Sequence, residues 1–212
     1  TYGIAPSQIV ILLAGGLGAL THLAGAPEDD LDQAADDARQ IAGGDCLICV
    51  TASGSTPYTL ALAKAARTRG AKVVGIANNP GAALFEVSDV AILLETPPEM
   101  VSGSTRMGAG TAQKIALNML STLMAIRLGH VHDGYMVNLR ADNNKLQNRA
   151  ARIVSEIAGI KMAAAVPLLD AASGSVKTAI LLAAGAENKN SAEAMLRESG
   201  QNVRRALGML GR

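Results

Sequence analysis

The stretch Cys46-Leu-Ile-Cys-Val-Thr-Ala-Ser-Gly-Ser-Thr-Pro57 carries the change of pattern on which the fold class depends. Its apolar first half, Cys46–Ala52, is typical of a buried strand, and the hydroxyl-rich Ser53–Thr56 is a turn. Thr56 is a candidate N-cap and Pro57 suits the first helical position, so a helix is predicted up to Gly70. A strand, a short turn and a helix in this order form the repeating unit of an α/β protein.

The same order recurs on both sides of this stretch. Further strands are predicted at Ile9–Ala14, Lys72–Ala77 and Asp89–Leu94. Helices are predicted at Leu17–Ala24 and at Thr111–Leu128, and an acidic segment from Glu28 leads into another helix that closes near Gly43-Gly44. Strands that alternate with helices predict a parallel sheet covered on both faces. After Asp133 the pattern becomes helical, at Asn143–Ala158, Lys161–Leu169, Val176–Ala184, Ser191–Glu198 (capped by Asn190-Ser191) and Gln201–Leu210.

Composition excludes several function classes. The chain of 212 residues is 49% hydrophobic with only three Tyr, one Phe and no Trp, so its core must be aliphatic. A net charge of +1 without dense basic runs excludes a nucleic-acid groove with stacking aromatics. The apolar run Ile9–Ala14 is too short to span a membrane, and residues 1–8 lack a signal-peptide pattern. We therefore expect a soluble, cytoplasmic protein.

Neither the cysteines nor the histidines predict a metal site. Cys46 and Cys49 lie three residues apart on a strand, so their side chains point to opposite faces, and no second pair exists. We interpret both as small buried residues. His130 and His132 are two residues apart, which suits neither one helical face nor a complete ligand set. We expect them at the surface near a turn.

A second hydroxyl-rich loop, Val101–Lys114, leads into the helix predicted at Thr111–Leu128. Short hydroxyls and glycines before a helix suit the binding of an anion by backbone N–H groups, although an ordinary helix cap explains such a loop equally well. Like Ser53–Thr56, this loop follows a strand, and ligands of parallel sheets bind beyond the carboxyl ends of the strands. Two such loops at one edge favour phosphate as the anion.

Blocks along nearly the whole chain resemble one family. They are Ala14-Gly-Gly16, Ala52-Ser-Gly-Ser-Thr-Pro-Tyr58, Asn79-Pro80, Pro98-Glu99, Gly103-Ser-Thr-Arg106, Ala109-Gly-Thr-Ala-Gln-Lys114, Leu117-Asn-Met-Leu-Ser-Thr122, Met136-Val137, Asn144-Lys-Leu146, Val176-Lys-Thr-Ala-Ile180 and Val203-Arg-Arg-Ala-Leu207. Together they resemble the N-acetylmuramic acid 6-phosphate etherases, a branch of the sugar isomerase (SIS) domain proteins. The resemblance implies a SIS-type parallel sheet over residues 1–140 and a helical extension with a small helical subdomain over 141–212.

The resemblance also implies an activity. Such enzymes split the D-lactyl ether of N-acetylmuramic acid 6-phosphate by eliminating lactate across C2–C3 of the open-chain sugar and then adding water. This chemistry needs an acid and a base but no metal or other cofactor. A homodimer is implied. The expected substrate-binding residues are Ser53, Gly54, Ser55, Thr56, Glu99, Ser102, Gly103, Ser104 and Thr105, and Arg106 and Lys114 are expected to position the loops.

The family uses two glutamates. Glu28 matches the second, and we expect it to act as acid or base; the alternative is an acidic residue placed in the first turn of a helix by the helix dipole. Thr1-Tyr2-Gly3 matches the end of the family segment that carries the first glutamate. That glutamate, a phosphate loop and the central first strand of SIS sheets all precede this position in the family. We therefore expect the sheet of this chain to lack its first strand. Ser55 stands where the family has a basic residue. The missing positive charge at Ser55 and the missing first glutamate favour an alternative, a non-catalytic regulator that binds a sugar phosphate. A ketose–aldose isomerase is a third possibility.

Overall fold

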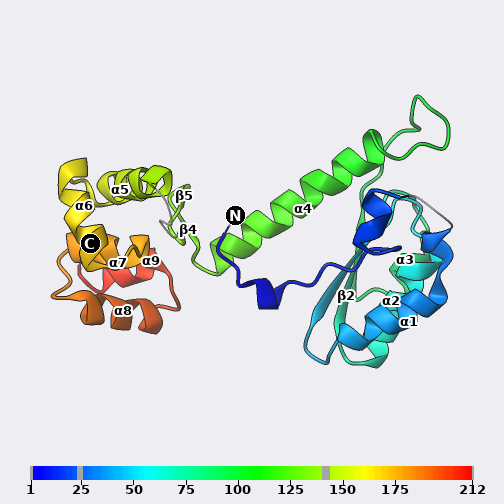
Figure 1. Ribbon diagram of the computed structural model, residues 1–212, viewed down its shortest axis with the longest axis horizontal. Helices are drawn as coiled ribbons and strands as arrows, with labels where there is room; N and C mark the ends of the chain where they lie inside the picture. Colours follow the sequence, from blue (N-terminus) through cyan, green and yellow to red (C-terminus); the bar gives the residue numbers. More distant parts are fainter. Residues whose placement is uncertain (1, 23–25, 140–143, 212) are drawn as a thin grey trace. The chain divides into compact units, whose positions relative to one another are not determined.

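The computed structural model describes residues 2–22, 26–139 and 144–211. The chain divides into two compact units: Val10–Asn118, here called the sheet unit, and Thr1–Ile9 with Met119–Arg212, called the helical unit. The division falls within the long helix α4, Gly108–Arg127 (Figure 1). The boundary predicted between residues 140 and 141 lies outside the described residues and stays a prediction.

The sheet unit contains three parallel strands in the order β1-β2-β3: β1 at Cys46–Val50, β2 at Lys72–Ala77 and β3 at Val90–Leu93. Val50 pairs with Ile76 and Ala77 pairs with Leu93, so the carboxyl ends of the strands lie at one edge. Helices α1 at Leu31–Asp37, α2 at Pro57–Thr68 and α3 at Ala83–Glu86 flank the sheet. The α/β class with a parallel sheet flanked by helices is confirmed.

The core of the sheet unit lies between the sheet and its helices. Apart from Tyr58, the buried residues are small or aliphatic, as the near absence of aromatic residues predicts. They include Ala34, Cys49, Leu62, Ala63, Ala66, Val73 and Leu84. Cys46 is exposed while Cys49 is buried, which confirms that the two thiols point away from each other but corrects the expectation that both are buried. Burial raises the pKa of the Cys49 thiol to about 12, so it stays protonated.

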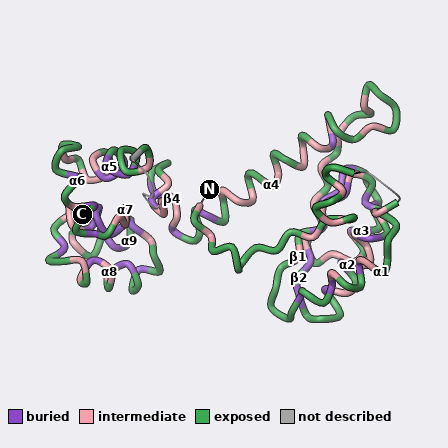
Figure 2. Tube along the Cα trace, viewed as in Figure 1, coloured by how far each residue is buried: buried purple, intermediate pink, exposed green. Residues whose placement is uncertain are grey.

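The strand predicted at Ile9–Ala14 is not formed. None of the described strands pairs with this segment, and Ile9, Val10 and Ile11 are 54, 60 and 81% exposed. Figure 2 shows this early part of the chain mostly in the exposed colour. A β-strand takes its stability from a neighbouring ladder and from a covering layer, and apolar sequence alone supplies neither. Only Leu12 and Ala14 of this segment pack against the core.

Two other local predictions for the sheet unit also need correction. The helix predicted at Leu17–Ala24 is a single 3-10 turn at Leu17–Leu20, and its predicted end lies outside the described residues. The short helix α3 was not predicted at all. Its four residues follow the turn at Asn78–Gly81 and are too few to show a helical period.

Besides the second half of α4, the described part of the helical unit contains five α-helices. They are α5 at Asn144–Ala158, α6 at Met162–Ala171, α7 at Val176–Ala183, α8 at Lys189–Glu198 and α9 at Val203–Gly208, and they agree with the predicted segments; Asn143 itself lies outside the described residues. The cap of α8 is Asn188, whose side chain accepts from the Ser191 backbone N–H at 2.9 Å, rather than the predicted Asn190-Ser191. Val154, Ile180, Leu181 and Val203 form the centre of this core.

Both histidines belong to one side of a hairpin: His132 lies in its first strand, and His130, which is half-buried, directly precedes that strand. Strands β4 at Val131–His132 and β5 at Tyr135–Met136 pair across Asp133-Gly134, whose φ angles of 47° and 79° are those of a type I′ turn. His132 is only 8% exposed, which corrects the expectation. Burial lowers the pKa of His132, against the opposing effect of Asp133, so the imidazole is neutral at pH 7.

Candidate functional site

The two hydroxyl-rich loops both belong to the sheet unit. Ser53–Thr56 directly follows β1, and Ser102–Thr105 lies between β3 and α4. Because β1 and β3 run parallel, both loops leave the sheet at its carboxyl edge. This edge was the predicted location of the site.

Hydroxyl groups of the first loop form a connected set. Thr51 Oγ1 lies 2.7 Å from Thr56 Oγ1, and Ser53 Oγ accepts from the Ser55 backbone N–H and from Ser55 Oγ, each at 3.2 Å. Thr56 occupies the N-cap position of α2 and Pro57 the first helical position, but the Thr56 side chain makes no capping bond. Ser53 and Ser55 are exposed. Their hydroxyls are therefore accessible for a ligand at the start of α2.

Gly54 is required at the centre of this loop. Its φ is +74°, and a Cβ built on it would lie 2.2 Å from the Cβ of Ala82. Its carbonyl accepts from the Leu84 backbone N–H at 3.0 Å, which joins the loop to the start of α3. Only glycine allows both this backbone conformation and this close approach. Gly54 therefore shapes the loop and brings no ligand-binding side chain.

The second loop is held by a carboxylate. Glu99 Oε1 accepts from the Gly108 backbone N–H at 2.7 Å and from the Ala109 N–H at 3.4 Å, while the Gly110 N–H donates to the Thr105 carbonyl at 2.8 Å. These N–H groups at the start of α4 are thus bound by the protein itself. Glu99 orients this loop, and a direct contact between Glu99 and a sugar stays a prediction.

Side chains of the second loop remain accessible. Ser102, Gly103 and Thr105 are exposed and Ser104 is half-buried, and the Ser104 backbone N–H closes a turn onto the Val101 carbonyl at 3.0 Å. Among the described residues, no hydrogen bond joins Ser102–Thr105 to Ser53–Thr56. In this part of the chain the loops share an edge of the sheet and are not joined directly by a hydrogen bond.

Asn78 and Gln113 join the residues that follow β1 and β3 to α4, and the sequence reasoning predicted neither as a site residue. Asn78 is buried at the end of β2; its backbone N–H donates to the Ala52 carbonyl at 3.0 Å and its Nδ2 to the Leu94 carbonyl at 2.8 Å. Its Oδ1 accepts from Gln113 Nε2 on α4 at 2.7 Å. The signal that could have found Asn78 is its position, since it directly follows an apolar strand at the ligand edge.

Glu28 lies in a short 3-10 turn, Pro27–Asp29, that packs against α2. The following helix α1 starts at Leu31 after the N-cap Asp30, so Glu28 is outside its first turn. Glu28 does lie in the first turn of the 3-10 helix, so its position agrees with both the catalytic and the helix-stabilising interpretation. The Glu28 side chain is exposed and forms no hydrogen bond or ion pair with a described residue. Its role as an acid or base stays a prediction.

Two further observations concern the described part of the chain. No group of three or more His, Cys, Asp or Glu side chains there could hold a metal ion. Among the helices that the structure describes, none combines the length and apolar character needed to cross a bilayer.

Comparison with known proteins gives a consistent result. The SIS domain family matches residues 21–123. N-acetylmuramic acid 6-phosphate etherases from Deinococcus radiodurans, Symbiobacterium thermophilum and Mycolicibacterium smegmatis are 43, 46 and 41% identical, over 98, 85 and 98% of this chain. The matched regions cover 69, 61 and 70% of these relatives. These names do not favour the regulator or the isomerase.

Proposed function

Because this chain belongs to the N-acetylmuramic acid 6-phosphate etherase family, we propose that it acts on N-acetylmuramic acid 6-phosphate and breaks the bond between C3 and the lactyl ether oxygen. A base removes the C2 proton while the ether oxygen leaves with a proton as D-lactate. Water then adds across C2–C3, with its hydroxyl at C3, and the product is N-acetylglucosamine 6-phosphate. The step is an elimination followed by a hydration and requires only acid–base catalysis.

The observation that supports this function best is the pair of hydroxyl loops at one sheet edge, where Asn78 and Gln113 join the residues after β1 and β3 to α4. We propose that Ser53, Ser55 and Thr56, shaped by Gly54, bind the phosphate at the start of α2, where N–H groups and the helix dipole favour an anion. Ser102, Ser104 and Thr105, shaped by Gly103, form the second wall around the sugar. Glu99 positions this wall and is also a candidate for a sugar contact.

Glu28 is the proposed acid or base of this chain. Its exposed carboxylate is unpaired among the described residues and belongs to a turn packed on α2, the helix that follows the first loop. Arg106 and Lys114 supply positive charge near the second loop. The proposal includes a homodimer, a cytoplasmic location and the division into domains 1–140 and 141–212, with no metal or other cofactor.

The test is release of D-lactate from N-acetylmuramic acid 6-phosphate. Replacing Glu28 by Gln removes proton transfer and is expected to lower kcat by a factor of about 10²–10⁴. Binding of N-acetylglucosamine 6-phosphate, followed by calorimetry, is expected to change little, because glutamine keeps the size and polarity of the side chain.

Asp29→Asn is the matched control, because Asp29 is an exposed carboxylate in the same turn. It is expected to retain wild-type turnover. Ser53→Ala is expected to act differently and to weaken binding of the sugar phosphate by about tenfold. Wild-type turnover by Glu28→Gln would exclude Glu28 as the proton-transfer residue.

A further inference from the structure

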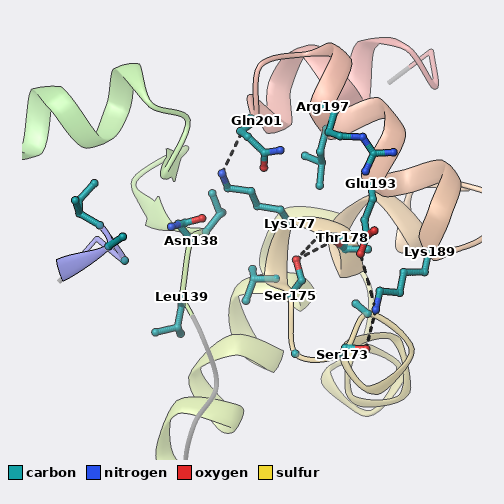
Figure 3. A pocket seen from close by; sticks show the side chains of 18 of the residues that line it. Asn138, Leu139, Ser173, Ser175, Lys177, Thr178, Lys189, Glu193, Arg197 and Gln201 are labelled. Carbon is teal, nitrogen blue, oxygen red and sulfur yellow. Dashed lines mark hydrogen bonds and ion pairs between the residues drawn. The ribbon is translucent and has the colours of Figure 1, made fainter. Parts of the chain in front are cut away.

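A pocket of about 960 Å³ lies within the helical unit, and none of its lining residues belongs to the hydroxyl loops. Figure 3 shows its polar lining: Lys177 and Ser175 at the start of α7, Arg197 and Glu193 on α8, and Ser173 in the preceding turn. The volume lies in the range of small-molecule sites. Neither the proposed catalysis nor the sheet edge uses this pocket.

Lys177 is the unusual member of the lining. Its side chain is 4% exposed, yet no carboxylate of the described chain lies within ion-pair distance of it. The ammonium group donates to the Gln201 carbonyl at 3.2 Å, which satisfies one of its three N–H groups. Burial lowers the pKa of Lys177 to about 8, so near neutral pH a charge is buried there without a counter-ion.

The rest of the lining has an excess of positive charge. Lys189 lies 3.8 Å from the single carboxylate of the lining, Glu193, and donates to Ser173 Oγ at 2.9 Å. The Arg197 guanidinium makes no ion pair or hydrogen bond with a described residue. Its charge and that of Lys177 are therefore not balanced by an acidic group in the described ranges 2–22, 26–139 and 144–211.

Short polar groups at the start of α7 complete the lining. Ser175 Oγ and Thr178 Oγ1 lie 2.8 Å apart, and either can donate to the other. The backbone N–H groups of Val176 and Lys177 form no hydrogen bond with a described residue, although both residues are buried. The eight-residue helix thus presents unused donors beside the buried ammonium group.

We propose that this pocket is a second binding site, which takes a small organic anion carrying a carboxylate or a phosphate monoester. The Lys177 ammonium pairs with the oxyanion, the start of α7 supplies further donors, and Arg197 contacts the ligand from the exposed side. Both anion types share the chemistry that the lining recognises. The inference does not depend on the proposed etherase activity.

The test measures binding to the 212-residue chain in zwitterionic buffer at pH 7. Inorganic phosphate, glucosamine 6-phosphate and D-lactate are titrated separately, and residue-resolved NMR shifts locate each ligand. We expect saturable shifts at Lys177 and at the start of α7 for at least one of the three, and the arm that responds identifies the anion type.

Lys177→Met keeps the length of the buried stem and removes its charge. It is expected to weaken binding at this pocket by about tenfold or more, because hydrogen bonds to charged groups are lost. Arg197→Gln changes an exposed residue, preserves the fold and is expected to weaken binding about two- to fivefold. Lys161→Met, an exposed lysine outside the pocket, is the matched control and is expected to change nothing.

Two results would overturn the inference. One is the absence of shifts at Lys177 with all three probes. If shifts then occur only at Ser53–Thr56 and Ser102–Thr105, the result supports the proposed function and excludes the second site. The other is unchanged affinity in both Lys177→Met and Arg197→Gln. If no lactate is released but the shifts at Lys177 occur, the proposed function is contradicted and the second site is not.

Discussion

At the level of single residues, Gly54 and Gly103 have nearly the same backbone angle but different surroundings. Their φ angles are +74° and +79°. A side chain on Gly54 would overlap Ala82, whereas nothing lies within 4 Å of the Cβ position on Gly103. The two loops therefore depend on glycine for different reasons. The first loop needs Gly54 for both its backbone conformation and its close packing, whereas the second loop needs Gly103 for its backbone conformation alone.

Gly54→Ala is expected to lower the free energy of unfolding of the sheet unit by roughly 2–4 kcal/mol, since left-handed backbone strain and overpacking both contribute. Gly103→Ala, the matched control, is expected to cost about 1–2 kcal/mol because only the backbone strain applies. Urea denaturation followed by circular dichroism measures both. Equal losses in the two variants would contradict the packing argument.

Lys177 makes the stability of the helical unit depend on pH. Its pKa falls from 10.5 to about 8 on folding, so between these values the unfolded chain binds more protons than the folded chain. Stability therefore rises with pH across this window. The neighbouring His130, whose pKa is lowered by burial and by Lys177, stays neutral there and adds no opposing change.

The free energy of unfolding is expected to rise between pH 8 and pH 10.5 by up to roughly 3 kcal/mol from this lysine. Lys177→Met is expected to lose that increment, while Lys161→Met keeps it. Urea midpoints at several pH values, compared between the two variants, isolate the contribution from other titrating groups. Identical pH profiles for both variants would rule out the assignment.

At the level of elements, α4 carries an apolar stripe that the described chain does not cover. Ile115, Met119, Leu123 and Ile126 are spaced by four, four and three residues and are all exposed. Such spacing places side chains on one face of a helix. An exposed stripe of this kind supports the proposed homodimer, because monomers rarely leave contiguous apolar surface in water.

Met119→Lys is expected to shift the monomer–dimer equilibrium of the chain toward monomer by about tenfold or more, because a charge would be buried in the interface. Met124→Lys is the control, since Met124 is also exposed but lies roughly 140° around the helix from Met119. Sedimentation equilibrium measures the constants. A monomeric wild-type chain would contradict the dimer proposal for this chain.

The hairpin at His130–Val137 shows how an element can be missed despite a clear signal. Asp133-Gly134 is a strong two-residue hairpin turn, and the register His132 opposite Tyr135 follows from it. The spacing of His130 and His132 instead led to the prediction that both histidines lie at the surface. The Asp133-Gly134 turn predicts the hairpin. It does not predict the burial of His132, because that burial depends on the helices around the hairpin.

At the level of the whole molecule, the described chain contains two separate hydrophobic cores. One lies in the sheet unit around Leu84 and Val73, and the other in the helical unit around Leu181 and Ile180. Residues in different cores have few contacts with one another. A substitution in one core should therefore destabilise mainly its own unit.

Leu181→Ala is expected to destabilise the helical unit by roughly 2–5 kcal/mol through loss of buried apolar surface and the cavity left behind. Amide hydrogen exchange is expected to accelerate in α5 to α9 and to stay unchanged in β1, β2 and α2. Leu84→Ala, equally buried in the other core, is expected to give the reverse pattern. A uniform acceleration in either variant would indicate one cooperative unit.

The amino-acid sequence by itself determined the local and short-range features of this protein. Alternating strands and helices, Thr56-Pro57 at the start of α2 and the two hydroxyl loops all depend on neighbours within a few residues, and the structure contains them. Tertiary structure decided the rest. Among the described residues, Ile9–Ala14 has no strand partner and the buried Lys177 has no counter-ion, while Glu99 caps α4 and Asn78 meets Gln113. Each of these depends on groups distant in sequence, because burial and pairing are properties of the packed chain.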